Sequence, residues 1–141
     1  MPIGLWRKKT PHIRDSGLLH ALLGISNFNE LFGHPVVGSS WEGFVVENLL
    51  NVAPERTIGG FFRTSGGAEI DLVLEFPGGA TWALEIKRDK APKVSRGFYS
   101  AIEDLQPDKA FVVHSGGEEY PVADGVTAIP LGKIIGNLLS M

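Results

Sequence analysis

Four charged residues in the middle of the chain have the types and spacing that metal-dependent chemistry requires. Glu69 and Asp71 lie in the strand-like run 69–76, and Glu85 and Lys87 lie in the run 81–88. Successive side chains of a strand point to opposite faces, so these four share one face. The opposite face would be wholly apolar and would carry Ile70, Leu72, Leu74, Phe76, Trp82, Leu84 and Ile86. One face of this hairpin is therefore predicted to be core, and the other to carry chemistry.

The loop between the two runs decides which charges face each other. Residues 77–79 read Pro-Gly-Gly, a hairpin signal, and a three-residue loop places Asp71 opposite Glu85 and Glu69 opposite Lys87. Opposed carboxylates repel, and a cation such as Mg²⁺ or Mn²⁺ held between them would offset the repulsion. A loop two residues longer would instead face Asp71 with Lys87 and give an ordinary surface ion-pair ladder. Both alternatives remain open at this point.

A metal at this place would suit phosphodiester hydrolysis. A bound divalent cation lowers the pKa of water, and Lys87, two residues beyond Glu85, would stabilise developing negative charge or orient the water. The sequence thus predicts a Mg²⁺-dependent site, with Asp71 and Glu85 as its carboxylates.

The elements around the hairpin indicate an α/β domain. The helix expected over residues 38–52 begins with Ser39 and Glu42 at capping-box spacing, and strand-like runs follow at 60–64, 69–76 and 81–88. A helix over 97–105, strands over 109–114 and 126–129, and a helix over 131–139 complete the pattern. The core order is αβββαβ, and a mixed sheet flanked by helices is the economical packing. Residues 1–37 are predicted to form an N-terminal helical extension that packs on the core of 38–141. Within this extension, a helix is expected over 15–24 and a further turn over 27–32.

The motif order resembles the restriction endonuclease-like, or PD-(D/E)xK, superfamily. The resemblance rests on Gly38-x-x-x-Glu42 in a helix, then Ile70-Asp71-Leu72-Val73, then Glu85-Ile86-Lys87, and then the strand Phe111-Val112-Val113. Together with Asp15-Ser16-Gly17-Leu18-Leu19 and Trp41-Glu42-Gly43-Phe44-Val45, these segments are similar to the C-terminal domain that follows the ATPase module in a group of prokaryotic AAA+ proteins.

The resemblance implies a role for each matching residue. Asp71 and Glu85 would be metal ligands, Lys87 the catalytic lysine, and Glu42 the helix acid that approaches the metal. Glu47, on another side of the same helix, is a rival to Glu42. The chain has no G-x-x-x-x-G-K-[ST] segment and so no P-loop for ATP, which makes it a separated domain or a stand-alone relative.

Composition limits the remaining possibilities. The net charge of −3 argues against nonspecific coating of nucleic acid, so contact would be local. Its predicted place is the basic loop and helix start, with Arg88, Lys90, Lys93 and Arg96, although a solvated basic loop is the alternative. Absence of cysteine excludes disulfides and thiolate sites, and no run reaches membrane-spanning length, so a cytoplasmic protein is expected.

Two functions follow as hypotheses. The first is a Mg²⁺-dependent nuclease acting on DNA. The second is a non-catalytic module that binds nucleic acid or a protein and regulates a partner AAA+ ATPase.

Overall fold

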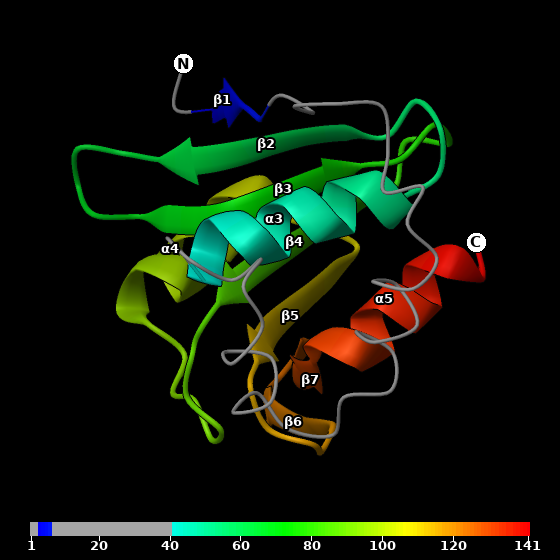
Figure 1. Ribbon diagram of the computed structural model, residues 1–141. Helices are drawn as coiled ribbons and strands as arrows, with labels where there is room; N and C mark the ends of the chain where they lie inside the picture. Colours follow the sequence, from blue (N-terminus) through cyan, green and yellow to red (C-terminus); the bar gives the residue numbers. More distant parts are fainter. Residues whose placement is uncertain (1–2, 7–40) are drawn as a thin grey trace.

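The computed structural model describes residues 3–6 and 41–141, and a seven-stranded mixed sheet forms its centre (Figure 1). The strands lie in the order β1-β2-β3-β4-β5-β7-β6. Neighbours are antiparallel from β1 to β4 and between β7 and β6, whereas β5 is parallel to both β4 and β7. The strands are β1 (Ile3–Leu5), β2 (Ile58–Arg63), β3 (Glu69–Glu75), β4 (Thr81–Ile86), β5 (Lys109–His114), β6 (Tyr120–Ala123) and β7 (Val126–Pro130).

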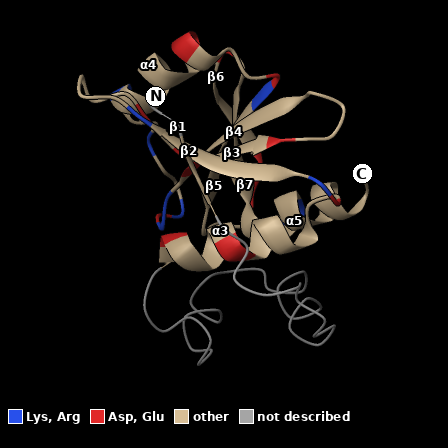
Figure 2. Cartoon of the chain, turned by 90° about the horizontal axis from the view of Figure 1, so that it is seen from above, with Lys and Arg blue, Asp and Glu red and all other residues tan. Residues whose placement is uncertain are grey.

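Helices cover both faces of the sheet. α3 (Trp41–Val52) and α5 (Leu131–Leu139) lie on one face, and α4 (Arg96–Leu105) lies on the other (Figures 1 and 2). Each face has its own buried apolar cluster. The α3/α5 side contains Leu49, Leu72, Leu84, Val113 and Ile134, and the α4 side contains Phe62, Ile70, Val73, Ala83 and Phe98.

The predicted α/β class and the order αβββαβ are confirmed. The strand over 109–114 and the helix over 131–139 have the predicted bounds, and the other elements differ by a few residues at their ends. The structure adds two short strands that the sequence pattern did not indicate, β1 and β6. The helix predicted over 15–24, the turn over 27–32 and the start of the helix at 38–40 lie outside the described residues. The division at residues 37 and 38 therefore stays a prediction.

From Leu72 to Glu75, the hairpin between β3 and β4 has the register expected for the three-residue loop, the first of the two alternatives. Phe76 N–H donates to Ala80 O at 2.9 Å, which closes the three-residue loop, and Gly79 takes a φ of 95° that glycine adopts without strain. The ladder runs from Glu75 opposite Thr81 to Leu72 opposite Leu84. The longer loop, which would have faced Asp71 with Lys87, does not form.

A β-bulge at Asp71 and Leu72 breaks the predicted alternation of β3. Two steps along β2, from Gly60 to Phe62, match three steps along β3, from Val73 to Ile70, so one extra residue lies in β3. As a result, Leu72 packs under α3 and α5, whereas Ile70 packs under α4. The prediction that Ile70 shares a face with Leu72 is wrong, because alternation assumes a strand without a bulge.

The prediction that one face of the hairpin is core while the other carries the chemistry holds only in part, because both faces contribute to the core. Val73 and Ala83, on the face assigned to chemistry, are buried under α4. The charged residues gather only where β3 and β4 stop pairing, beyond Leu72 and Leu84. The site therefore occupies one end of a doubly covered sheet rather than an exposed sheet face.

Among the strands of the described residues, β6 forms the far edge of the sheet, and it is short and irregular. Pro121 lies in this strand, and the register with β7 shifts between Pro121 and Ala123. Within residues 3–6 and 41–141, no helix is long and apolar enough to cross a membrane.

Candidate functional site

The Asp71 carboxylate bridges the two strands where their ladder ends. Its Oδ2 accepts a hydrogen bond from Ile86 N–H at 2.8 Å, so it occupies a position that a backbone carbonyl would fill in a continuing ladder. The side chain of Trp6, on the segment after β1, donates from Nε1 to Asp71 O at 3.1 Å. Asp71 is only partly exposed. Its backbone and carboxylate are therefore both held by specific donors.

Glu85 is the most enclosed acid of the site, with 8% of its side chain exposed. Its Oε2 accepts from Ser95 N–H at 3.2 Å, and its Oε1 lies 3.5 Å from Lys87 Nζ. Ser95 is also the N-cap of α4, because its hydroxyl accepts from Phe98 N–H at 3.2 Å. Glu85 thus connects the end of β4 to the start of α4, with one oxygen on each partner.

Lys87 lies just beyond β4, on the rim of the site. Its backbone N–H donates to Val113 O at 2.9 Å, which extends the pairing with β5, and its side chain is 36% exposed. The predicted position of Glu69 opposite Lys87 is wrong. Glu69 pairs with Arg63 on β2, at 3.6 Å between Oε1 and Nε, because β3 has already separated from β4.

Burial raises the pKa of the Asp71 carboxyl from 3.8 to about 6. The Ile86 N–H bond opposes this change, and the negative charges of Glu42, Glu69 and Glu85 add to it. Glu42, in the first turn of α3, is therefore within electrostatic reach of Asp71, while Glu47 on the same helix is exposed. The geometry favours Glu42 over Glu47 as the helix acid.

The predicted carboxylates approach one another without forming a compact ligand shell. Among residues 3–6 and 41–141, no three Asp, Glu or His side chains lie close enough together to hold a metal. Mg²⁺ is commonly bound by one or two carboxylates, with water and substrate phosphate completing its shell. Asp71 and Glu85 fit that smaller requirement, with Glu42 at longer range, and the metal itself stays a prediction.

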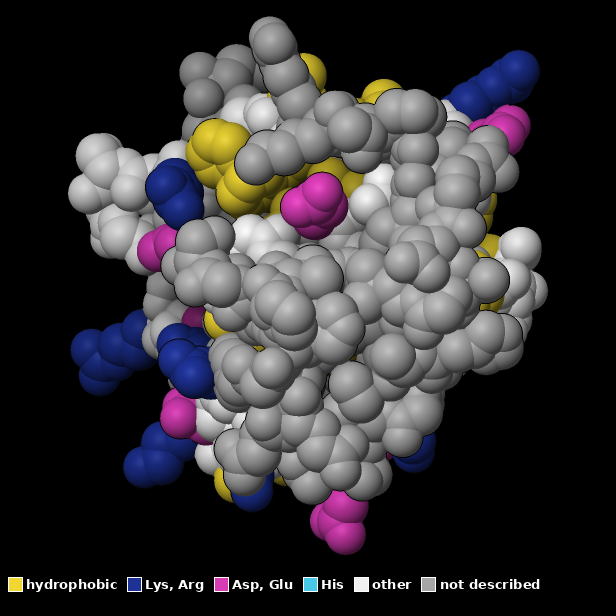
Figure 3. Space-filling view, in the orientation of Figure 1, with side chains coloured by type: hydrophobic (Ala, Val, Ile, Leu, Met, Phe, Trp, Pro, Cys, Tyr) yellow, Lys and Arg dark blue, Asp and Glu magenta, His cyan; other side chains and the backbone are white. Residues whose placement is uncertain are grey.

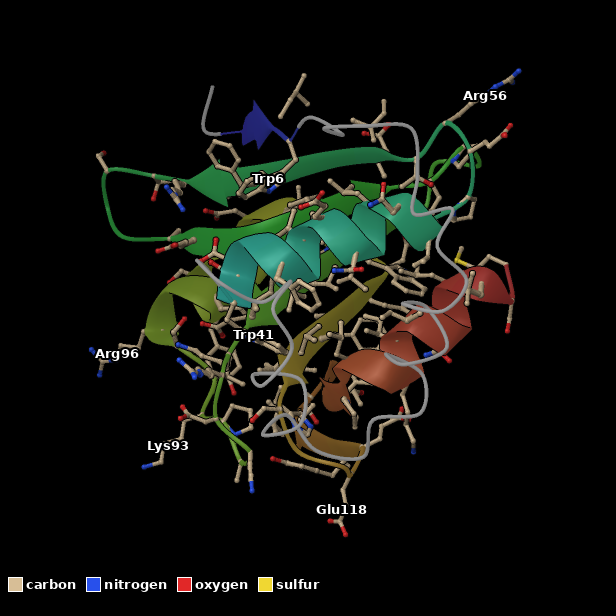
Figure 4. All side chains as sticks on the ribbon, in the orientation of Figure 1. Trp6, Trp41, Arg56, Lys93, Arg96 and Glu118 are labelled. Atoms are coloured by element: carbon tan, nitrogen blue, oxygen red, sulfur yellow. The ribbon has the colours of Figure 1, made fainter. Side chains whose placement is uncertain are left out.

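The basic loop runs directly from this site to α4. Arg88, Lys90 and Lys93 are exposed, and Arg96 is the exposed first residue of the helix. Lys93 and Arg96 point outward on the same side of the molecule in Figure 4, where Lys and Arg side chains also gather in Figure 3. The loop is anchored to the rest of the fold by Ser115 N–H, which donates to Asp89 O at 3.1 Å.

A surface hollow of about 420 Å³ lies elsewhere, beside the start of β5 and β7. Its lining includes Lys109, Thr127 and Asn137, and none of the predicted site residues. Because Lys109 is paired with Trp82, this hollow is near the opposite end of β4 from Glu85. Its position gives no support to the candidate site.

Comparison with known proteins places the chain in a family. Residues 37–134 match the model of a domain of unknown function, DUF4143. The chain belongs to this family. DUF4143 is a C-terminal domain of AAA-type ATPase-associated proteins.

Two mycobacterial proteins are similar to this DUF4143 chain. Uncharacterized proteins of Mycobacterium bovis and Mycobacterium tuberculosis are each 39% identical to it over 135 residues. The match covers 94% of this chain and 30% of each relative, so the chain spans less than a third of their length. No solved structure matches it significantly.

Three contributors to the DUF4143 site were not predicted from the sequence. Ser95 supplies the N–H that holds Glu85, and its place three residues before Phe98 at a helix start was a recognisable capping signal. Ile86 contributes only its backbone N–H, which any residue would supply. Trp6 acts from 65 residues away, and no local pattern indicates such a contact.

Proposed function

We propose that this DUF4143 domain is a Mg²⁺- or Mn²⁺-dependent nuclease that hydrolyses phosphodiester bonds, with DNA as the expected substrate. The observation that carries the proposal is the Asp71 carboxyl, which is held at a strand bulge by Ile86 N–H and whose pKa is raised by burial and, to a lesser extent, by the charges of Glu42, Glu69 and Glu85. Glu85 and Glu69 already pair with Lys87 and Arg63, and a hard divalent cation would relieve the negative charge that remains at Asp71. The order α3, β2, β3, β4, α4, β5 supports the proposal, since it matches that of the PD-(D/E)xK superfamily.

Each residue has a distinct part in the proposed reaction. Asp71 and Glu85 would hold the cation, with Glu42 contributing at longer range. The bound cation would lower the pKa of a water and polarise the phosphate. Lys87, with its ammonium 3.5 Å from Glu85 and a partly exposed side chain, would orient the water or stabilise the charge that develops on the phosphate.

The basic loop would hold the nucleic-acid backbone beside this centre. Arg88, Lys90 and Lys93 follow Lys87 directly, and Arg96 begins α4, so phosphates bound there would lie next to the carboxylates. Contacts with phosphate contribute affinity without reading base sequence. Within a chain of net charge −3, this local cluster would give weak binding that falls as salt increases.

A second function is favoured by the engagement of Glu85. Both of its oxygens already contact protein groups, Ser95 N–H and Lys87 Nζ, and its side chain is largely enclosed. A carboxylate satisfied in this way can act as a brace between β4 and α4. The domain would then be a non-catalytic module that binds nucleic acid or protein and regulates a partner AAA+ ATPase, consistent with the setting in which the family occurs.

Metal titration separates the two functions. After treatment with a chelator, the wild-type domain is melted with and without Mg²⁺ or Mn²⁺. A ligand at about 100 times its Kd stabilises the folded state by about 2.7 kcal/mol. We expect the melting temperature to rise with metal in the wild type and in Glu75→Gln, which alters an exposed acid at the other end of β3. Asp71→Asn should lose the metal-dependent rise.

Cleavage is measured on supercoiled DNA, single-stranded DNA and RNA. The nuclease proposal expects metal-dependent cutting that Lys87→Ala removes without removing the metal-dependent rise in melting temperature. If the wild type shows neither metal stabilisation nor cutting of any substrate, the nuclease proposal fails and the non-catalytic module replaces it.

Charge reversal tests the basic loop. Lys93→Asp should weaken binding of a fluorescent oligonucleotide, and the effect should shrink as salt rises. Arg56→Asp is the matched control, because Arg56 is exposed at the opposite end of the molecule and its φ of 70° is one that Asp tolerates (Figure 4). Equal losses in the two variants would show that net charge, rather than the loop, governs binding.

A further inference from the structure

The segment that begins with β1 reaches the candidate site through one side chain. Trp6 directs its indole between β2 and α3, and its Nε1–H donates to Asp71 O at 3.1 Å (Figure 4). This contact joins residues 65 positions apart. It acts on the backbone of the residue whose carboxylate is central to the site.

The orientation of the indole is fixed by its surroundings. Trp6 N–H donates to Gly59 O at 2.9 Å, which continues the pairing of β1 with β2. The ring meets Phe61 edge-on, with 5.6 Å between centroids, and packs against the cluster under α3. Gly4 makes room for Phe61, because a Cβ at position 4 would lie 2.1 Å from the Phe61 ring. The indole therefore has a defined direction before it meets Asp71.

The contact lies where neither neighbouring strand pairs with Asp71. Asp71 lies at the bulge, which interrupts the ladder with β2, and beyond Leu72, where the ladder with β4 ends. A peptide group in such a place can rotate unless another donor holds its carbonyl. Once the bond from Trp6 is lost, the backbone at the bulge is also free to shift, and a shift of the Asp71 Cα carries its carboxylate away from Ile86 N–H.

We propose that Trp6 is a positioning residue for Asp71: by holding the Asp71 carbonyl, its indole N–H keeps the Asp71 carboxylate on Ile86 N–H. The value of this arrangement for catalysis rests on the proposed nuclease function. The positioning itself does not, since it concerns the structure of the domain without metal or nucleic acid.

The test compares Trp6→Phe with the wild type by NMR, in the presence of a chelator and without nucleic acid. Phenylalanine keeps an aromatic ring against Phe61 and removes the N–H donor. If the Asp71 carboxylate leaves Ile86 N–H, that amide loses its acceptor. We expect the Ile86 amide proton to exchange with solvent at least about ten-fold faster in Trp6→Phe than in the wild type. The resonance of this amide should also move toward the position of an amide without a hydrogen bond.

Trp82→Phe is the matched control. It makes the same chemical change in the aromatic cluster with Phe76 and Phe111, at the opposite end of β4. This variant should lose stability and leave both signals of the Ile86 amide unchanged. If Trp6→Phe also leaves them unchanged while the protein loses stability, Trp6 only packs against the core and the proposal is overturned.

Two measurements keep the test decisive if Trp6→Phe does not fold. In the wild type, the Trp6 indole N–H should exchange with solvent far more slowly than an exposed indole, and rapid exchange would contradict the bond to Asp71. A benzothiophene analogue of tryptophan at position 6 keeps the ring shape and replaces N–H with sulfur. It should reproduce the change at the Ile86 amide, and unaltered amide signals would again overturn the proposal.

Discussion

Replacing Asp71 with asparagine should stabilise the domain at neutral pH. The Asp71 carboxyl is enclosed and surrounded by the charges of Glu42, Glu69 and Glu85, so ionising it in the folded state is unfavourable. Asparagine is nearly isosteric, keeps an oxygen that can accept from Ile86 N–H, and carries no charge. The substitution removes the unfavourable ionisation and retains the hydrogen bond.

The magnitude follows from the raised pKa. The pKa of Asp71 is about 6 in the folded state and 3.8 without that environment. Each pKa unit corresponds to about 1.36 kcal/mol, so the gap is worth about 3 kcal/mol as an upper estimate. A raised carboxyl pKa contributes stability that is fully present below 3.8 and is lost as the pH rises through 6. Asparagine does not titrate, so the advantage of Asp71→Asn should be small at pH 4, increase up to about pH 6 and stay constant above it.

Urea unfolding at a series of pH values, with a chelator present, measures this difference directly. Glu75→Gln is the matched control, because it neutralises an exposed acid on the same strand and should show no such step between pH 4 and 6. A difference between Asp71→Asn and the wild type that does not change with pH would refute the reasoning. It would mean that Asp71 has the same pKa in the folded and unfolded chains.

Three further predictions concern residues around the site. Gly97→Ala should destabilise the domain by about 1–3 kcal/mol in the same urea assay, because the new Cβ would clash with Gly67 O. Gly136→Ala is the control: a Cβ there meets open space in α5, so this variant should be more stable by up to about 1 kcal/mol. Ser95→Ala should cost about 1 kcal/mol of unfolding free energy through loss of the α4 cap, and an unchanged urea midpoint would show that the cap contributes nothing. Burial lowers the pKa of His114, so the NMR titration midpoint of its imidazole should lie below 6.5. The stability that the neutral imidazole contributes should be present above pH 6.5 and lost as the pH falls through that midpoint. A midpoint at or above 6.5 would contradict the enclosed, neutral ring.

The sequence predicted the fold well where structure is decided locally. The Pro-Gly-Gly loop set the register of β3 and β4, because a three-residue loop leaves little choice of pairing. The apolar run at Phe111 to Val113 predicted a buried strand, since a parallel strand covered on both faces is apolar throughout. These features depend on residues close together in the chain.

The sequence did not predict what depends on distant partners. Nothing near Asp71 indicates the bulge that turns Ile70 and Leu72 to opposite faces, because the bulge is defined by pairing with β2. β1 is three residues long and Trp6 lies just beyond it, so neither has enough residues to show a period. The candidate acids were therefore identified by type and spacing, while the groups that hold them were found only in three dimensions.

Pro121 in β6 affects how this edge of the sheet can pair with a strand of another chain. A row of free backbone donors along a sheet edge is a template on which another chain can add a strand and begin to aggregate. Pro121 has no N–H, and the strand changes register beside it, so this edge offers a broken row of donors to any incoming strand. By this argument, β6 is a poor template for open-ended association at this side of the sheet.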